Sequence, residues 1–144
     1  QGRAVIQTCN PDHPVIDYAS RQDYDAFYKS EIAYRRAMLF PPFCHIALIS
    51  VTGEDERSVM ETSTGLYTLL TDLIGGEYRD VALICFGPFE AAVYRVNRTF
   101  RYRIVCKIKQ GSRTRELLRR LLNFGGEKGI GGCTIAVDID PDTV

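Results

Sequence analysis

Apolar residues from position 43 onward alternate between strand-like and helix-like spacing. Five segments are continuously apolar or alternate between apolar and polar side chains, as expected of strands: 44–51, 81–86, 91–96, 100–109 and 133–139. Two further segments repeat apolar residues at helical spacing: 55–73 and 112–124. If 81–86 and 91–96 form one interrupted strand, the predicted order is strand, helix, strand, strand, helix, strand.

This order is that of a split β-α-β unit, in which an antiparallel sheet carries both helices on one face. The sequence therefore predicts an α+β domain of ferredoxin-like topology, with the other face of the sheet open to a partner. Thr52 and Asp55 are expected to mark the start of the first helix. Ser112 is expected to cap the second helix, and Gly125 and Gly126 to end it.

Residues 1–42 follow a different pattern. Residues 4–8 read as a short strand that lacks a neighbouring strand in the sequence, and two helices are expected next, the second from about residue 23 to 38. The run Phe40-Pro41-Pro42-Phe43 then breaks the helix, because proline cannot continue it. We expect a domain boundary there, with 1–42 completing something upstream and 43–144 forming a separate domain. A first residue of Gln1 also favours a piece of a longer protein.

Charge is divided unevenly along the chain, although its 18 basic and 18 acidic side chains cancel. Residues 1–90 carry 7 Lys and Arg against 13 Asp and Glu, whereas residues 91–144 carry 11 against 5. Within 95–120 there are 10 basic side chains and 1 acidic side chain. This concentration of positive charge predicts an anionic partner for the second part of the chain.

The strand at 100–109 is the clearest candidate binding site. Because strand side chains alternate between faces, one face is predicted to carry Arg101, Arg103, Lys107 and Lys109. Arg95 and Arg98 lie just before the strand, and Tyr94 is a candidate for stacking on a base. Nucleic acid is the favoured ligand, since an ordinary solvated face usually mixes both signs of charge. A solvated face or a protein partner remains the alternative.

The last predicted helix has an apolar half and a basic half. The basic half is predicted to carry Arg113, Arg115, Arg119 and Arg120. The first two lie in the first turn, where the helix dipole disfavours cations. This placement suggests a binding site for an acidic peptide or a terminal carboxylate. The alternative, given equal weight, is that the two arginines bind no partner and the fold tolerates their unfavourable interaction with the helix dipole.

Metal and catalytic sites are disfavoured by the spacing of the candidate residues. The five cysteines form no C-x-x-C pair, which argues against zinc. Asp138 and Asp140 share a face, but two carboxylates rarely suffice for a hard cation. Cys44 and His45 are adjacent on a strand and so point to opposite faces. We therefore expect no catalytic residue, cofactor or metal in this chain.

Membrane insertion and secretion are also disfavoured. No apolar run approaches the ~18 residues that a membrane span requires, and no signal peptide is apparent. An odd number of cysteines, mostly in apolar runs, favours a reducing compartment, which predicts a cytoplasmic location.

Short motifs occur along the whole chain in a distinctive order. They are residues 2–8, Asn10-Pro11-Asp12-His13, Asp23-Tyr24, Phe27-Tyr28, Glu31, Arg35-Arg36, Phe40-Pro41-Pro42-Phe43, Gly87-Pro88, Tyr102-Arg103 and residues 137–141. Their order and spacing resemble the C-terminal part of the primosomal protein N′ family of bacterial replication-restart helicases. Phe40 stands where the family has Tyr in Tyr-Pro-Pro-Phe.

The resemblance implies a function for each part of the chain. The family is an ATP-dependent superfamily 2 DNA helicase that unwinds 3′ to 5′ and restarts replication at stalled forks. Residues 1–42 would be the tail of its second helicase lobe and a linker helix. Residues 43–144 would be its C-terminal domain, which resembles a small-subunit ribosomal protein in fold. Residues 101–109 would face single-stranded or forked DNA.

The resemblance also implies partners. Arg113 would lie near the acidic tail of single-stranded-DNA-binding protein, and other primosome proteins would dock on the same parent protein. The family's ATP, magnesium and zinc motifs have no counterpart in this stretch, so those cofactors would belong to the parent. The competing hypothesis is a protein-interaction platform that does not contact nucleic acid.

Overall fold

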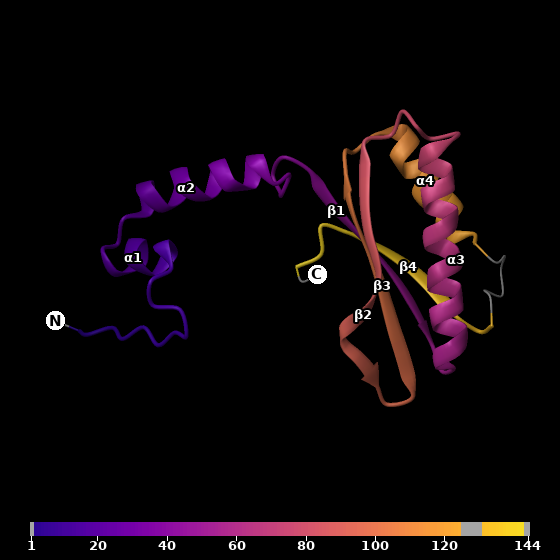
Figure 1. Ribbon diagram of the computed structural model, residues 1–144, viewed down its shortest axis with the longest axis horizontal. Coiled ribbons are helices and arrows are strands. Elements are labelled where there is room, and N and C mark those ends of the chain that lie inside the picture. The colour runs from indigo at the N-terminus through magenta and orange to yellow at the C-terminus, as the bar shows by residue number, and fades with distance from the viewer. Residues whose placement is uncertain (1, 125–130, 143–144) are drawn as a thin grey trace. The chain divides into compact units, whose positions relative to one another are not determined.

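The chain divides into two compact units, Gln1–Leu39 and Phe40–Val144. The structure is a computed structural model that describes residues 2–124 and 131–142. Figure 1 labels the helices and strands of both units. Within those two described ranges, every helix is too short or too polar to cross a bilayer.

The first unit contains two helices, as predicted: α1 (Pro14–Ser20) and α2 (Tyr24–Ala37). His13 caps α1, since its Nδ1 accepts a hydrogen bond from the backbone N–H of Val15 at 3.3 Å. Asp23 caps α2 in the same way by accepting from the N–H of Ala26 at 3.0 Å. Side-chain oxygen or nitrogen acceptors satisfy the otherwise unpaired N–H groups of a first helical turn.

The predicted strand at residues 4–8 is wrong. These residues are exposed and belong to no helix or strand. A strand needs a neighbouring strand to pair its N–H and C=O groups. Among the residues of this unit that the structure describes, no other segment is extended into a strand, so a short run rich in apolar and β-branched residues does not by itself produce one here.

The second unit is a four-stranded antiparallel sheet with two helices, so the predicted α+β fold is confirmed. Its strands follow the order β2-β3-β1-β4. They are β1 (His45–Gly53), β2 (Leu83–Val96), β3 (Thr99–Ile108) and β4 (Thr134–Ile139). The helices α3 (Glu56–Gly75) and α4 (Ser112–Leu122) lie on one face of the sheet (Figure 1). This is the split β-α-β arrangement that the order of elements predicted.

The hydrophobic core lies between this face and the two helices. Alternate residues of the central strands point into it, among them Ile49 and Val51 of β1 and Ile104 of β3, all with no exposed surface. Leu66 of α3 and Leu117 of α4 meet them from the helix side and are equally buried. Each such side chain contributes roughly 1.5–3 kcal/mol through its removal from water.

The long strand β2 confirms that the two predicted segments form one interrupted strand, which begins at Leu83 rather than at residue 81. Its pairing with β3 shifts register twice, between Phe86 and Phe89 and between Glu90 and Arg95. Each shift leaves extra residues on β2 opposite the regular β3, which is the definition of a β-bulge. The hairpin then closes at a turn that contains Asn97 and Arg98.

The two helix starts differ in detail from the prediction. Asp55 caps α3 by accepting from the N–H of Ser58 at 2.8 Å, and the hydrogen bonds from Ser58 lower the pKa of Asp55. Thr52 instead lies within β1, because the strand extends further than its apolar run.

Ser112 is the first residue of α4 rather than its cap. Gly111 occupies the cap position in an extended conformation, and its lack of a side chain leaves no cap hydrogen bond. At the other end, α4 stops at Leu122 with Asn123 as the C-cap. The predicted stop at residues 125–126 lies outside the described part of the chain.

Candidate nucleic-acid interface

The sheet face opposite α3 and α4, called the open face below, collects side chains from all four strands. Cross-strand partners share a face, so its members follow from the strand register. They are Ile84, Phe86 and Phe89 of β2, Arg101, Arg103, Val105 and Lys107 of β3, Ile46, Leu48, Ser50 and Thr52 of β1, and Thr134, Ala136 and Asp138 of β4. The structure thus brings Arg101, Arg103 and Lys107 to one face.

The electrostatics of the open face are dominated by these cations. Arg101 and Arg103 form no ion pair with any other described residue, and the buried Nε of Arg101 has no hydrogen-bond partner there. Lys107 Nζ lies 4.0 Å from the ring centre of Phe40 and 5.8 Å from that of Phe86. Among the residues that define the open face, Asp138 on the edge strand β4 is the one acid.

The remaining predicted DNA-binding cations lie at the ends of the strands. Lys109 follows the last residue of β3 and is exposed. Arg98 lies in the β2–β3 turn, where it is also exposed. The guanidinium of Arg95 lies 5.0 Å from the ring centre of Phe100 and its Nε donates to the carbonyl of Asn97 at 3.2 Å. The structure therefore separates these three from the cations at the middle of the open face.

Tyr94, the predicted stacking residue, contacts other parts of the domain. Its hydroxyl donates to Glu56 Oε1 at 2.5 Å, at the start of α3, and this bond raises the pKa of Tyr94. Its ring packs edge-on against Phe100 at 5.6 Å and Tyr102 at 5.8 Å between centres. Both neighbours pack against the core on the helix side of the sheet. These contacts therefore hold the Tyr94 ring on the helix side and not on the open face.

The aromatic residues of the open face were not predicted from the sequence. Phe86 and Phe89 of β2 are exposed there by 42% and 50%. In a regular strand, side chains three residues apart point to opposite faces, but the bulge at Gly87 and Pro88 returns Phe89 to the face of Phe86. The pair Gly-Pro was the one local signal of an irregularity.

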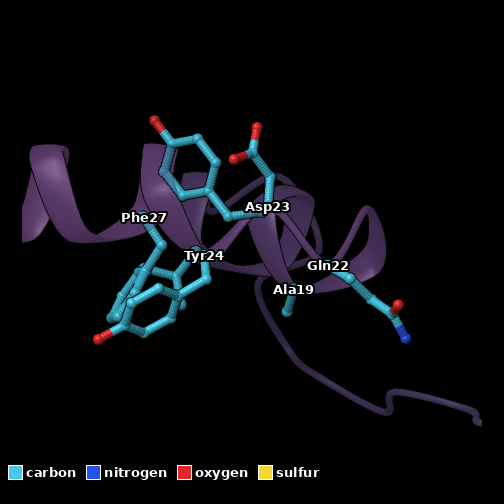
Figure 2. A pocket seen from close by; sticks show the side chains of 7 residues that line it. Ala19, Gln22, Asp23, Tyr24 and Phe27 are labelled. Carbon is cyan, nitrogen blue, oxygen red and sulfur yellow. The ribbon is translucent and has the colours of Figure 1, made fainter.

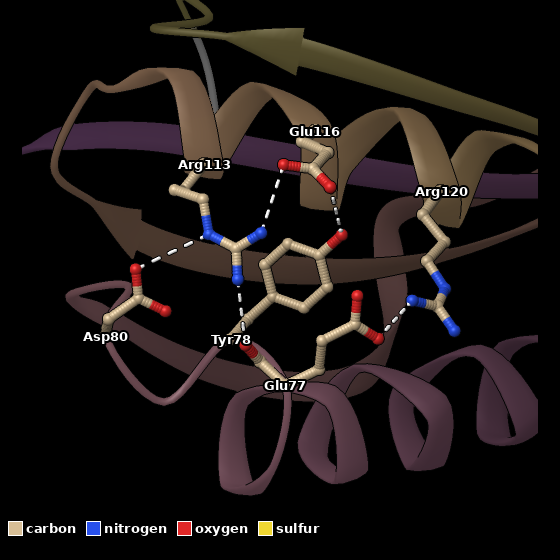
Figure 3. A network of polar contacts seen from close by, with 6 residues as sticks. All are labelled: Glu77, Tyr78, Asp80, Arg113, Glu116 and Arg120. Carbon is tan, nitrogen blue, oxygen red and sulfur yellow. Dashed lines mark hydrogen bonds and ion pairs between the residues drawn. The ribbon is translucent and has the colours of Figure 1, made fainter.

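Figure 3 shows two of the four predicted docking arginines of α4 bound to the protein's own oxygen atoms. Arg113 is 3.5 Å from Asp80 and 3.2 Å from Glu116, and it donates to the carbonyl of Glu77 at 2.8 Å. Asp80 and then Glu116 raise the pKa of Arg113. Arg120 is 2.5 Å from the carboxylate of Glu77.

The other two α4 arginines differ from these. Arg115 and Arg119 are exposed and form no ion pair with a described residue. Of the predicted docking residues, they are therefore the two whose charges no other residue in the described ranges compensates.

A second polar site joins the start of β1 to the end of β4. His45 Nδ1 lies 2.6 Å from Asp140 Oδ2, and the other carboxylate oxygen accepts from the N–H of Ile46 at 2.9 Å. The bond to His45 and the bond from Ile46 lower the pKa of Asp140. A cavity of about 410 Å³ lies beside this pair. Asp140 thus contacts His45 rather than sharing a ligand with Asp138, and no group of three metal-ligating residues occurs in the described ranges.

The first unit contains an apolar groove of about 400 Å³ between its two helices. Figure 2 shows its lining, which includes Ala19, Gln22, Tyr24 and Phe27. The rings of Tyr24 and Phe27 lie 6.3 Å apart. No pattern in the sequence had marked this groove, and it gathers one acid, Asp23, which already caps α2.

Comparison with known proteins finds relatives that match nearly the whole chain. The replication restart protein PriA of Bacillus subtilis is 28% identical over 141 residues, which are 97% of this chain and 17% of that protein. PriA of Borreliella burgdorferi is 29% identical over 136 residues, or 94% and 19%. PriA of Thermotoga maritima is 28% identical over 144 residues, or 100% and 17%. The chain therefore spans less than a fifth of the length of these relatives.

A family model gives the assignment that the motifs had suggested. Residues 36–142, well over half of the chain, match the model described as the primosomal protein N C-terminal domain. The predicted resemblance is therefore confirmed, and the chain belongs to the family of primosomal protein N C-terminal domains.

Proposed function

We propose that the domain 43–144 binds single-stranded or forked DNA through its open face and docks partner proteins during replication restart. Its role is binding and not catalysis. One observation carries the proposal: Arg101, Arg103 and Lys107 lie together on β3, and no acid shares the β1, β2 or β3 part of the open face. Cations placed this way release counterions from a phosphate backbone when it binds.

The contrast with α4 supports this assignment. Arg113 and Arg120 already neutralise Asp80 and Glu77, whereas Arg101 and Arg103 have no such partner among the described residues. An unpaired cation gains more from a phosphate than one that must first break an ion pair. Arg98 and Lys109 would extend the contact toward the ends of the strands, whereas Arg95 is opposite Phe100 and so lies on the helix side of the sheet.

Partner docking is the second part of the proposal. The exposed cations Arg115 and Arg119 of α4 would attract an acidic segment, such as that of single-stranded-DNA-binding protein or of another primosome protein. Helicase activity, with its ATP, magnesium and zinc, would belong to the longer parent protein. A cytoplasmic location is part of the same proposal.

The test is fluorescence anisotropy with single-stranded and forked DNA over a series of salt concentrations. The double variant R101Q/R103Q is compared with R115Q/R119Q, which removes equal charge from α4. We expect the logarithm of the binding constant to depend less steeply on the logarithm of salt in R101Q/R103Q, by about 0.7 per cation lost for a single strand. The α4 variant should bind DNA nearly as the wild type does.

Two results would count against the proposal. Equal losses in both double variants would mean that DNA responds to net charge and not to the open face. Retention of DNA affinity in R101Q/R103Q, with loss of an acidic peptide in R115Q/R119Q, would favour a protein-interaction platform instead.

A further inference from the structure

Three large apolar side chains are exposed side by side along the edge strand β2. Ile84, Phe86 and Phe89 are 46%, 42% and 50% exposed on the open face. An edge strand with an exposed apolar row is unusual, because such rows promote association. Their position next to the cations of β3 suggests what they bind.

The bulge of β2 fixes the two phenylalanines on the same face. Phe86 is opposite Val105 and Phe89 is opposite Arg103, so Gly87 and Pro88 together face one residue of β3. Gly87 has a φ of +121°, and a Cβ added there would lie 2.9 Å from the carbonyl oxygen of Arg103. Only glycine fits this conformation, so the backbone is built to carry Phe89 back to the open face.

Each ring has a cation beside it. Phe89 and Arg103 are cross-strand partners, and Lys107 Nζ lies 5.8 Å from the ring centre of Phe86. Successive positions on one face of a strand are roughly 6.7 Å apart. The rings and the charges therefore run as two parallel rows along β2 and β3.

Two such rows match a nucleic acid whose bases are unpaired. In a duplex the bases are stacked inside and the outer surface presents phosphates, so an exposed ring finds no base face to cover. In a single strand each base has a free face that stacks on an aromatic ring, while cations hold the phosphates. A duplex would use the arginines and leave the phenylalanines in water.

We infer that Phe86 and Phe89 form a stacking platform for unpaired bases, with Arg103 and Lys107 holding the adjacent phosphates. This inference rests on the proposed function and deepens it. It assigns single-stranded DNA, and not duplex DNA, to the middle of the open face. It also assigns the stacking contact to Phe86 and Phe89 in place of Tyr94.

The experiment separates base contacts from phosphate contacts. Wild type, F86A and F89A are titrated with a thymidine oligonucleotide and with an abasic oligonucleotide of the same length. We expect each ring deletion to weaken binding of the thymidine strand about 5-fold or more while the salt dependence stays unchanged. The abasic strand should bind the wild type more weakly and should not distinguish it from the variants.

Further variants test whether a loss of affinity comes from a folding defect, and whether apolar bulk without a flat ring is sufficient for binding. F86L and F89L keep apolar bulk but have no flat ring, so they should lose affinity as the alanine variants do. M60A removes a side chain on α3 that is 46% exposed, and it should bind like the wild type. Urea unfolding of each variant confirms that the compared proteins are folded.

The possible outcomes distinguish base stacking by Phe86 and Phe89 from the proposed binding of DNA by the open face. If the wild type binds both oligonucleotides equally, or F86L and F89L keep full affinity, stacking is refuted while DNA binding by the cations stands. If the wild type binds neither strand but binds an acidic peptide, the proposed DNA-binding function fails as well, and the open face is a protein interface.

Discussion

The guanidinium carbon of Arg113 lies 4.4 Å from the centre of the Tyr78 ring, so a cation of α4 covers an aromatic side chain from the α3–β2 connection. Tyr78 is itself 1% exposed and donates its hydroxyl to Glu116 at 3.1 Å. Figure 3 shows both contacts within one network. This arrangement explains how an arginine is accommodated in the first turn of α4, since Asp80 and Glu116 offset the unfavourable dipole.

Removal of the Tyr78 hydroxyl and removal of its ring should lower the free energy of unfolding by different amounts. Tyr78→Phe loses one hydrogen bond and keeps the packing, which should lower the free energy of unfolding by about 1 kcal/mol. Tyr78→Ala also leaves a cavity and should cost about 3–5 kcal/mol. Urea denaturation followed by circular dichroism measures both. Similar losses in the two variants would show that the ring contributes little.

The bulge of β2 gives a second prediction. Gly87→Ala must hold a non-glycine residue at a φ of +121° with its Cβ near the carbonyl of Arg103, so it should lose roughly 1–3 kcal/mol of stability. Gly75→Ala is the matched control, because a Cβ there meets no atom within 4 Å. The control, at the end of α3, should be neutral or stabilised by up to about 1 kcal/mol. Equal unfolding midpoints for the two variants would contradict this account.

The order of elements was predictable because periodicity reports burial. One face of the sheet and one side of each helix are buried, so alternate residues in β1 and β3 and every third or fourth residue in α3 and α4 had to be apolar. The same reasoning placed Arg101, Arg103 and Lys107 on the opposite face. Residues 4–8 show where this reasoning fails. A strand needs a neighbouring strand to pair with, and the residues within a segment do not reveal whether one is present.

The details of the candidate site were less predictable for a physical reason. Phe89 changes face because of a bulge, which shifts the parity of all residues after it. Arg113 and Arg120 were predicted to be available cations, but Asp80 and Glu77, more than 30 positions away, approach them through the fold. Charge in a sequence window therefore gives the sign of a surface, while tertiary contacts decide which charges are already compensated.

The cysteines should differ sharply in reactivity. Burial raises the pKa of Cys106 to about 12, and the thiolate is the reactive form. Cys9 is exposed. Brief treatment of the native protein with iodoacetamide at pH 8 should label Cys9, and Cys106 should react only after unfolding in urea. Peptide mass spectrometry measures the ratio. Labelling of Cys106 at the rate of Cys9 under native conditions would show that the core opens readily.

The contact between His45 and Asp140 predicts a pH dependence of stability. The hydrogen bond to His45 lowers the pKa of Asp140 below its ordinary value of 3.8. The folded protein therefore binds this proton less readily than the unfolded chain does, and the stabilisation is complete above about pH 3.8 and lost as pH falls through the folded-state pKa. The free energy of unfolding should decline over that acidic range.

Asp140→Asn isolates this contribution. Asn tolerates the positive φ of 53° at this position, so the variant removes the charge without straining the backbone. Its urea midpoint should lie below that of the wild type at pH 6, and the difference should shrink toward pH 3. Asp138→Asn, in β4 two residues before Asp140, should show a smaller difference, because the carboxylate of Asp138 forms no hydrogen bond or ion pair with another described residue. A gap between the wild type and Asp140→Asn that stays constant from pH 6 to pH 3 would mean that the carboxylate charge does not stabilise this end of the sheet.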